Sequence, residues 1–167
     1  MRPVGKSMFD SDPVKVFIAP PGQGSAEQWV RLQYPDIVRD KVRRAPGERV
    51  GVVTVLDGDR FGVSTRKKSL DRALSDKGES PRSAEERIAI CVPTWSIETW
   101  LAWLCGWKDV AENQSYKNET RYRRAVDQGQ ISPATALDHW PNPDSAEGAT
   151  VPSLTDARRE LDRLTRQ

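Results

Sequence analysis

The sequence is poor in the residues that most often bind transition metals. It contains one histidine, His139, and two cysteines, Cys91 and Cys105. The cysteines lie in separate apolar segments, and neither belongs to a CxxC pair, so the usual four-ligand zinc site of Cys and His is excluded. We interpret both cysteines as buried free thiols and assign His139 no catalytic role.

Long apolar runs are also missing. The chain has no apolar stretch long enough to span a bilayer, and its N-terminus lacks the apolar segment of a secretion signal. These absences predict a protein without a membrane anchor and with a cytoplasmic location. An excess of one charge is missing as well, because 26 Lys and Arg stand against 24 Asp and Glu. Any binding of nucleic acid must therefore come from local clusters of bases.

Three short segments rich in β-branched residues are present instead, and such segments are typical of strands. The middle one does not alternate between apolar and polar residues, which predicts a strand covered on both faces. The last is apolar from Ile88 to Val92 and ends at Pro93. The predicted strands span residues 14–19, 49–56 and 87–92.

Helical patterns follow each predicted strand. Ser25 precedes Gln28 by three residues, a capping-box pattern that predicts a helix start, and Pro35 is expected to break this helix in two. Strands and helices that alternate along the chain predict an α/β fold, with a small parallel sheet flanked by helices. The predicted helices span residues 25–44, 64–75 and 96–106.

The last third of the sequence is more polar and contains further helical patterns. Ser132 followed by Pro133 is typical of a helix start, and residues 153–166 carry apolar residues at helical spacing. We therefore predict two parts. They are an α/β core at residues 14–106 and a C-terminal helical annex at 107–167 that packs on this core.

Two aspartates, Asp57 and Asp59, directly follow the middle strand. Residues two apart on an extended backbone project from the same side, and ligands of parallel sheets bind just beyond the carboxyl ends of the strands. A divalent cation removes the repulsion between two such carboxylates, and Mg²⁺ commonly uses one or two of them with waters and phosphate. The pair predicts a site for Mg²⁺ or Mn²⁺. The alternative is that Asp57 caps a turn and Asp59 is solvated.

Glu98 follows the third predicted strand, so in a parallel sheet it lies on the same rim as the two aspartates. We expect Asp57, Asp59 and Glu98 to act together as metal ligands and catalytic residues. The alternative for Glu98 is favourable placement in the first turn of a helix, worth about 0.3–1 kcal/mol.

Four bases follow the aspartate pair and are expected to contact the phosphate oxygens of a substrate. The alternative is a solvated helix face. These bases are Arg60, Arg66, Lys67 and Lys68.

A second group of bases alternates with tyrosines, a pattern that can stack on single-stranded bases, although a polar helix is the commoner explanation. It consists of Tyr116, Lys117, Arg121, Tyr122, Arg123 and Arg124.

The segment VVTVLDGD, followed by a helix, a strand and PTWSIETWLAWL, resembles the Toprim-like fold over residues 14–106. More narrowly, it is similar to bacterial proteins of the OLD/RloB-like type, several of which are associated with anti-phage defence. The resemblance implies a magnesium-dependent nuclease or phosphotransferase that acts on nucleic acid. It gives Asp57 and Asp59 the metal-binding role, and Glu98 matches the acidic residue of the later Ile-Glu-x-Trp element.

The sequence departs from this family in one respect. Toprim domains also carry a glutamate on a first strand, followed by a helix, and only 13 residues precede Val14 here. Either the chain starts late relative to its relatives, or the glutamate that serves as general acid and base is absent. That departure favours an alternative, a non-catalytic Toprim-like module that binds a protein or nucleic-acid partner. A third possibility is an unrelated small α/β binding protein in which the aspartates only cap a turn.

Overall fold

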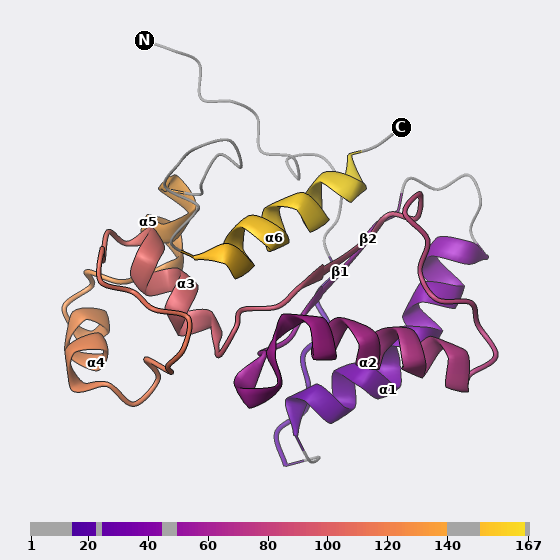
Figure 1. Ribbon diagram of the computed structural model, residues 1–167, viewed down its shortest axis with the longest axis horizontal. Helices are drawn as coiled ribbons and strands as arrows, with labels where there is room; N and C mark the ends of the chain where they lie inside the picture. The colour runs from indigo at the N-terminus through magenta and orange to yellow at the C-terminus, as the bar shows by residue number, and fades with distance from the viewer. Residues whose placement is uncertain (1–14, 23–24, 45–49, 140–150, 166–167) are drawn as a thin grey trace, which may run out of the picture.

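The computed structural model describes residues 15–22, 25–44, 50–139 and 151–165. These residues form six α-helices and a small parallel sheet, so the predicted α/β class is confirmed (Figure 1). In chain order the elements are α1 (Ala26–Val38), the π-helical turn η1 (Arg39–Arg43), β1 (Val52–Val55), the 3-10 turn η2 (Asp59–Phe61), α2 (Gly62–Asp76), β2 (Ile88–Cys91), α3 (Ile97–Leu104), α4 (Thr120–Asp127), α5 (Pro133–Asp138), α6 (Pro152–Leu161) and the 3-10 turn η4 (Asp162–Leu164).

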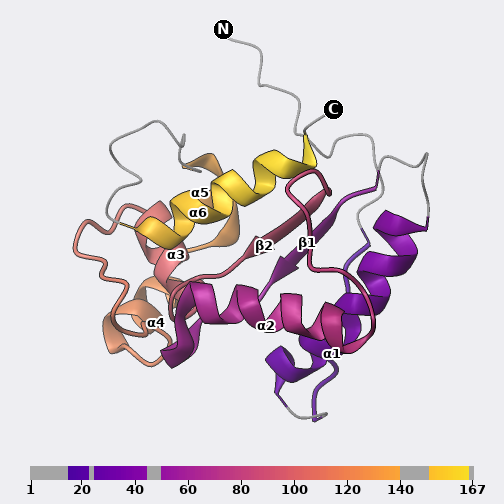
Figure 2. The same cartoon turned by 45° about the vertical axis from the view of Figure 1, so that its right-hand side comes forward.

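The sheet lies between helices. β1 and β2 run parallel, with Val52 opposite Ile88 and Val55 opposite Cys91. Helices α1 and α2 cover one face of the sheet, and α6 lies along β2 on the other face (Figures 1 and 2). The last helix of the predicted annex therefore packs directly on the sheet. All of β2 is buried, as the sequence predicted.

Two apolar clusters hold these layers together. The first joins α1 and α2 to the sheet and consists of Tyr34, Val38, Leu56, Leu70, Leu74, Ile88, Ile90 and Val92. The second joins α3 to α6 and includes Trp100, Trp103, Tyr116, Tyr122, Leu154 and Ala157. Cys91 on β2 belongs to this second cluster, so the strand contributes to both.

The predicted strand at residues 14–19 is wrong for the part that the structure describes. Residues 15–20 have no regular secondary structure, and residue 14 lies outside the described ranges. Val16 is 70% exposed and Ile18 is 77% exposed. A β-branched run forms a strand when a neighbouring strand pairs with it and its side chains are buried, and neither condition holds here.

The prediction that the middle strand is covered on both faces is also wrong. Within β1, Thr54 is buried, but Val53 is 44% exposed and Val55 is 51% exposed. Thr54 faces the cluster under α1 and α2, whereas the two valines point to the opposite face. Because α6 packs along β2, it leaves these valines uncovered.

Local sequence signals predicted the helix starts correctly, but the predicted break at Pro35 is wrong. The Ser25 hydroxyl accepts a hydrogen bond from the Gln28 N–H at 3.1 Å, and the Ser132 hydroxyl accepts one from the Thr135 N–H at 3.1 Å. Helix α1 continues through Pro35 and leads into the π-helical turn η1. Proline cannot donate a backbone hydrogen bond, and burial of Tyr34 and Val38 in the core offsets the free energy lost with that bond.

Two further predictions concern exposure and membranes. Both cysteines are free thiols, as expected, but Cys105 is half-buried while Cys91 is buried. No helix in the described part of the chain has the length and apolar character that crossing a membrane requires.

Glu160 of α6 fastens this helix to the outer edge of β2. Its Oε2 accepts a hydrogen bond from the Ile90 N–H at 3.2 Å, and its Oε1 accepts from Lys67 at 2.7 Å and from Arg82 at 2.9 Å. Arg82 also donates to the Ile88 carbonyl at 3.1 Å. Burial opposes ionisation of Glu160, but the hydrogen bonds from Arg82, Lys67 and Ile90 outweigh it and lower its pKa to about 2.

We predict that Glu160→Gln destabilises the protein by about 3 kcal/mol at pH 7, because it leaves the largely buried Arg82 without its anion and removes one of the two anions that contact Lys67. The pKa of Glu160 lies below its ordinary value of 4.5, so its contribution is present above that pH and is lost as the pH falls toward 2. Urea unfolding of both proteins between pH 7 and pH 3 measures this difference. An equal loss at every pH, or a similar loss in the exposed control Glu85→Gln, would contradict the prediction.

Candidate functional site

The loops that follow β1 and β2 are hydrogen-bonded to each other. The Gly58 N–H donates to the Pro93 carbonyl at 2.8 Å, and the Asp59 N–H donates to the Trp95 carbonyl at 3.0 Å. In return, the Ile97 N–H donates to Oδ1 of Asp57 at 3.2 Å. These bonds extend the pairing of the two strands beyond their ends. We call the resulting surface, made of residues 57–59 and 93–98, the strand-end rim.

Gly58 makes this pairing possible. A Cβ atom at this position would lie 2.3 Å from the Thr94 carbonyl oxygen and 2.7 Å from the Pro93 carbonyl oxygen. Both atoms belong to the backbone and cannot move aside as a flexible side chain would. The two loops therefore approach at a distance that only glycine permits.

Asp57 and Glu98 are neighbours at the rim, because the Ile97 N–H that binds Asp57 belongs to the residue directly before Glu98. Burial raises the pKa of Asp57 above its ordinary value, and the negative charge of Glu98 raises it further. The Ile97 N–H acts in the opposite direction, Asp59 adds a smaller repulsion, and Lys117 offsets part of it. The rim thus holds a half-buried carboxylate next to a second anion.

Asp57 and Asp59 have different partners, and the segment between them is not extended as the sequence analysis assumed. The backbone leaves the extended conformation at Gly58, and Asp59 has a positive φ of 46° at the start of η2. Its carboxylate forms an ion pair with Arg66 at 2.8 Å. The prediction assumed an extended DxD segment, whereas the chain turns between the two aspartates.

Arg66 is buried, which corrects its predicted contact with a phosphate. Its Nε donates to the Asp57 carbonyl at 3.0 Å, and its other nitrogens contact Asp59 at 2.8 Å and Glu27 at 3.1 Å. The guanidinium also lies 4.9 Å from the centre of the Phe61 ring. Arg66 therefore fixes the loop after β1, and only 8% of its surface remains exposed.

The other three bases that were predicted to contact phosphate differ in their surroundings. Lys67 binds Asp156 at 2.6 Å and Glu160 at 2.7 Å, so it belongs to the interface between α2 and α6. Arg60 and Lys68 are exposed. For these two residues a contact with phosphate stays a prediction.

The interleaved bases and tyrosines do not form a stacking surface, because Tyr116 and Tyr122 are buried in the second apolar cluster. The four bases of this group are exposed. Arg121 stacks on Trp107, with 3.9 Å from its guanidinium carbon to the ring centre, and forms an ion pair with Asp109.

Two hydroxyls at the start of α3 escaped the sequence analysis. Ser96 and Thr99 are buried, and neither side-chain oxygen has a hydrogen-bond partner among the residues that the structure describes. Ser96 precedes α3 in the N-cap position, yet its side chain makes no capping bond. The sequence shows the serine as an ordinary cap, so only the structure could show that its hydroxyl is buried and makes no capping bond.

Across the described ranges, no group of three or more acidic, histidine or cysteine side chains is arranged to hold a metal ion. This result agrees with the turn of Asp59 toward Arg66. What remains at the rim is a pair of carboxylates, Asp57 and Glu98, with the Ser96 hydroxyl nearby in sequence. Oxygen donors of this kind fit a hard divalent cation that keeps several waters.

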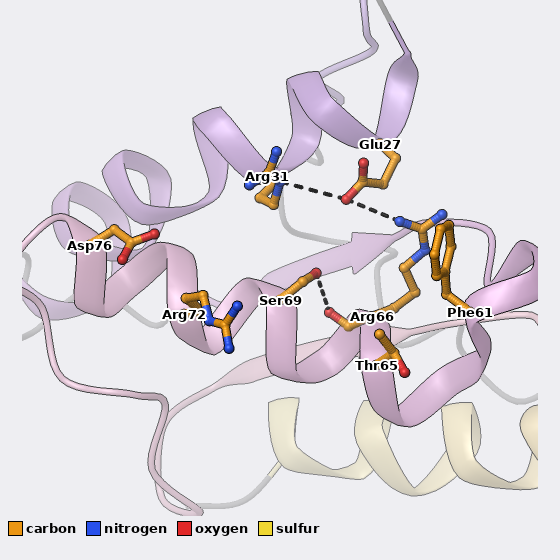
Figure 3. Close-up of a pocket in the computed structure, with 8 residues that line it drawn as sticks. All are labelled: Glu27, Arg31, Phe61, Thr65, Arg66, Ser69, Arg72 and Asp76. Carbon is orange, nitrogen blue, oxygen red and sulfur yellow. Dashed lines mark hydrogen bonds and ion pairs between the residues drawn. The ribbon is translucent and has the colours of Figure 1, made fainter.

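A separate cavity of about 240 Å³ lies behind the rim, between α1 and α2 (Figure 3). Arg66 connects the cavity to the strand-end rim, because its guanidinium contacts Glu27 in the cavity wall and Asp59 at the rim. The lining residues are Glu27, Arg31, Phe61, Thr65, Arg66, Ser69, Arg72 and Asp76. Acids and bases are mixed in this wall, so it shows no clear preference for an anion or a cation.

Comparison of the chain with protein-family models, with curated proteins and with solved structures found no match. The function is therefore argued from the geometry of the rim.

We predict that Gly58→Ala destabilises the protein by about 1–3 kcal/mol, because the new methyl group collides with backbone atoms of the facing loop. Gly62→Ala is the matched control: it has a positive φ of 74° but no atom within 4 Å, so it carries conformational strain without a collision. Urea unfolding at pH 7 measures both. A Gly58→Ala variant as stable as the parent would show that the loops can separate freely.

We also predict that Asp57→Asn stabilises the metal-free protein at neutral pH. The folded-state pKa of Asp57 is raised, so its ionised form costs stability, and the cost appears as the pH rises through that pKa. Asparagine removes the charge and keeps an oxygen that can accept from Ile97. Thermal unfolding in EDTA should give a higher Tm for the variant at pH 7 and equal values at acidic pH. A lower Tm at pH 7 would contradict the prediction.

Proposed function

We propose that this chain is a Toprim-like protein whose strand-end rim binds a divalent cation through Asp57 and Glu98 and acts on a phosphodiester of nucleic acid. The observation that carries the proposal is the hydrogen-bonded pairing of the two strand-end loops. That pairing holds together the two loops that carry Asp57 and Glu98, at the carboxyl ends of adjacent parallel strands, where such sheets bind their ligands.

The residues at the rim support Mg²⁺ or Mn²⁺ as the cation. Asp57 and Glu98 supply hard oxygen donors, and both residues are partly exposed at the rim. Mg²⁺ commonly takes one or two carboxylates and completes its shell with waters and substrate phosphate. Asp59 is left out of this set, in contrast to the sequence-based expectation, because Arg66 already neutralises it.

The other residues of the rim would position the substrate and the loop. Arg66 holds the loop after β1 through the Asp57 carbonyl and the Asp59 carboxylate. Exposed Arg60 and Lys68 would contact non-bridging phosphate oxygens, and Lys117 carries positive charge close enough to influence Asp57. A bound cation would supply charge stabilisation to the phosphoryl group.

A second candidate is a Toprim-like module that binds nucleic acid or protein without cleaving it. The ion pair between Asp59 and Arg66 favours this candidate, because an internal guanidinium takes the place that a cation would otherwise fill beside the second aspartate. Binding would then depend on exposed bases around the rim and would need no metal.

Cleavage of labelled DNA and RNA, single- and double-stranded, in Mg²⁺, Mn²⁺ or EDTA tests the proposal. We expect cleavage only with a divalent cation and a loss of at least about 100-fold in Asp57→Asn and in Glu98→Gln. Glu85→Gln, an exposed change away from the rim, is the control.

Cleavage that survives in both rim variants would contradict the assignment. Binding of the same nucleic acids, measured by fluorescence anisotropy, separates the two candidates. Retained binding without cleavage in any metal would favour the non-catalytic module.

A further inference from the structure

A second cavity, of about 310 Å³, lies beside α4. The Trp107 ring forms part of its wall, and the rest carries side chains that donate or accept hydrogen bonds. Among the described residues, none that line this cavity is acidic, in contrast to the cavity between α1 and α2. Guanidinium groups, amides and an aromatic ring together provide the chemistry that recognises a nucleotide. The polar lining residues are Thr120, Arg121, Arg124, Gln128 and Gln130.

The guanidinium of Arg121 forms a planar platform in this cavity. It stacks on Trp107, with 3.9 Å from its central carbon to the ring centre, and it forms an ion pair with Asp109 at 2.6 Å. The Arg121 side chain is still 55% exposed, so the face of the guanidinium that points away from Trp107 is open. Because Asp109 already neutralises its charge, Arg121 offers a stacking surface more than an attraction for anions.

Arg124 supplies the charge that Arg121 lacks. It follows Arg121 by three residues on α4, so the two side chains lie on one face of the helix. The Arg124 side chain is exposed and has no ion pair or hydrogen bond among the residues that the structure describes. A guanidinium that is free to bind a phosphate therefore lies next to the platform.

The cavity lies on the side of the strand-end rim where Glu98 is found. The rings of Trp107 and Tyr122 are in edge-to-face contact, with 6.2 Å between their centres. Burial and the nearby charge of Glu98 raise the pKa of Tyr122 to about 12. Lys117, which precedes α4, is exposed and carries positive charge that acts on Asp57. Both ribbon views show α4 next to α3, the helix that begins at the rim (Figures 1 and 2).

We propose that the cavity beside α4 binds one unpaired nucleotide of a single strand whose scissile phosphodiester lies at the strand-end rim. The base stacks on the open face of Arg121, the Gln128 and Gln130 amides bind its edge, and Arg124 contacts the adjoining phosphate. The proposal rests on the proposed function, because it takes nucleic acid as the ligand. It adds the strand state of the substrate and the residues that recognise it.

The Arg121 platform distinguishes a single strand from a duplex. Within a duplex the neighbouring bases cover both faces of each base, so a base can stack on a guanidinium only after it has left the helix. That step costs unpairing and unstacking energy, and an unpaired base avoids most of this cost. Single strands should therefore bind more tightly than duplexes of the same sequence.

Fluorescence anisotropy of short labelled DNA and RNA strands and their duplexes, measured in EDTA, tests the proposal without the cation on which cleavage depends. We expect single strands to bind at least about 10-fold more tightly than duplexes. Arg121→Lys should weaken single-strand binding at least about 10-fold, because lysine keeps the charge but lacks the plane. Arg124→Lys should cause a smaller loss, because a phosphate contact needs the charge and not the plane.

A matched pair of double variants separates this site from general attraction between charges. Arg121→Gln/Arg124→Gln and the control Arg123→Gln/Arg159→Gln each remove two positive charges from exposed residues, but the control residues do not line the cavity. We expect the first to bind at least about 10-fold more weakly than the control at the same salt concentration. Circular dichroism confirms that each variant is folded.

Strands with one abasic position identify the bound base, because they keep every phosphate. One position should weaken binding to the parent protein at least about 10-fold and should have a much smaller effect on Arg121→Lys.

The proposal would be overturned if no strand bound, if duplexes bound as tightly as single strands, or if the two double variants lost affinity equally. Binding of AMP or dTMP as tight as that of the oligonucleotides would overturn it too, because the cavity would then take a free nucleotide. The proposed function fails separately, through cleavage that survives in Asp57→Asn and Glu98→Gln, and the binding measured in EDTA does not depend on that result.

Discussion

The candidate site depends on the backbone contact between Gly58 and the loop at Pro93 and Thr94. This contact extends the register of a short sheet past the ends of its strands. It also sets the start of α3, because the Ile97 N–H is held by the Asp57 side chain. Glu98 follows directly, so one close approach between two loops determines where both carboxylates of the rim lie.

The carboxylates of the molecule have different partners, and this difference defines the rim. Asp59 and Glu160 each have an internal cation, Arg66 in one case and Arg82 with Lys67 in the other. Asp57 has a backbone N–H as its partner and faces Glu98. The fold thus neutralises the acids that hold it together and keeps a pair of anions at the carboxyl ends of the strands, which supports cation binding there.

The sequence predicted what short-range patterns determine. The helix starts at Ser25 and Ser132 and the buried strand β2 follow from capping and apolar runs, and the parallel pairing of the two strands follows from the alternation of strands and helices. Tertiary packing decided the rest. Whether 15–19 forms a strand, whether Pro35 ends a helix and whether Arg66 is exposed all depend on neighbours that are distant in the sequence, and no local pattern indicates which neighbour will be there.

The central claim is that Asp57 and Glu98 together bind a divalent cation. Isothermal titration of Mn²⁺ and Mg²⁺ into the metal-free protein and into Glu98→Gln tests it without requiring a substrate. The account predicts one saturable site in the parent protein that is weakened at least about 10-fold by the variant. Equal binding in both proteins, or no binding in the parent, would contradict it.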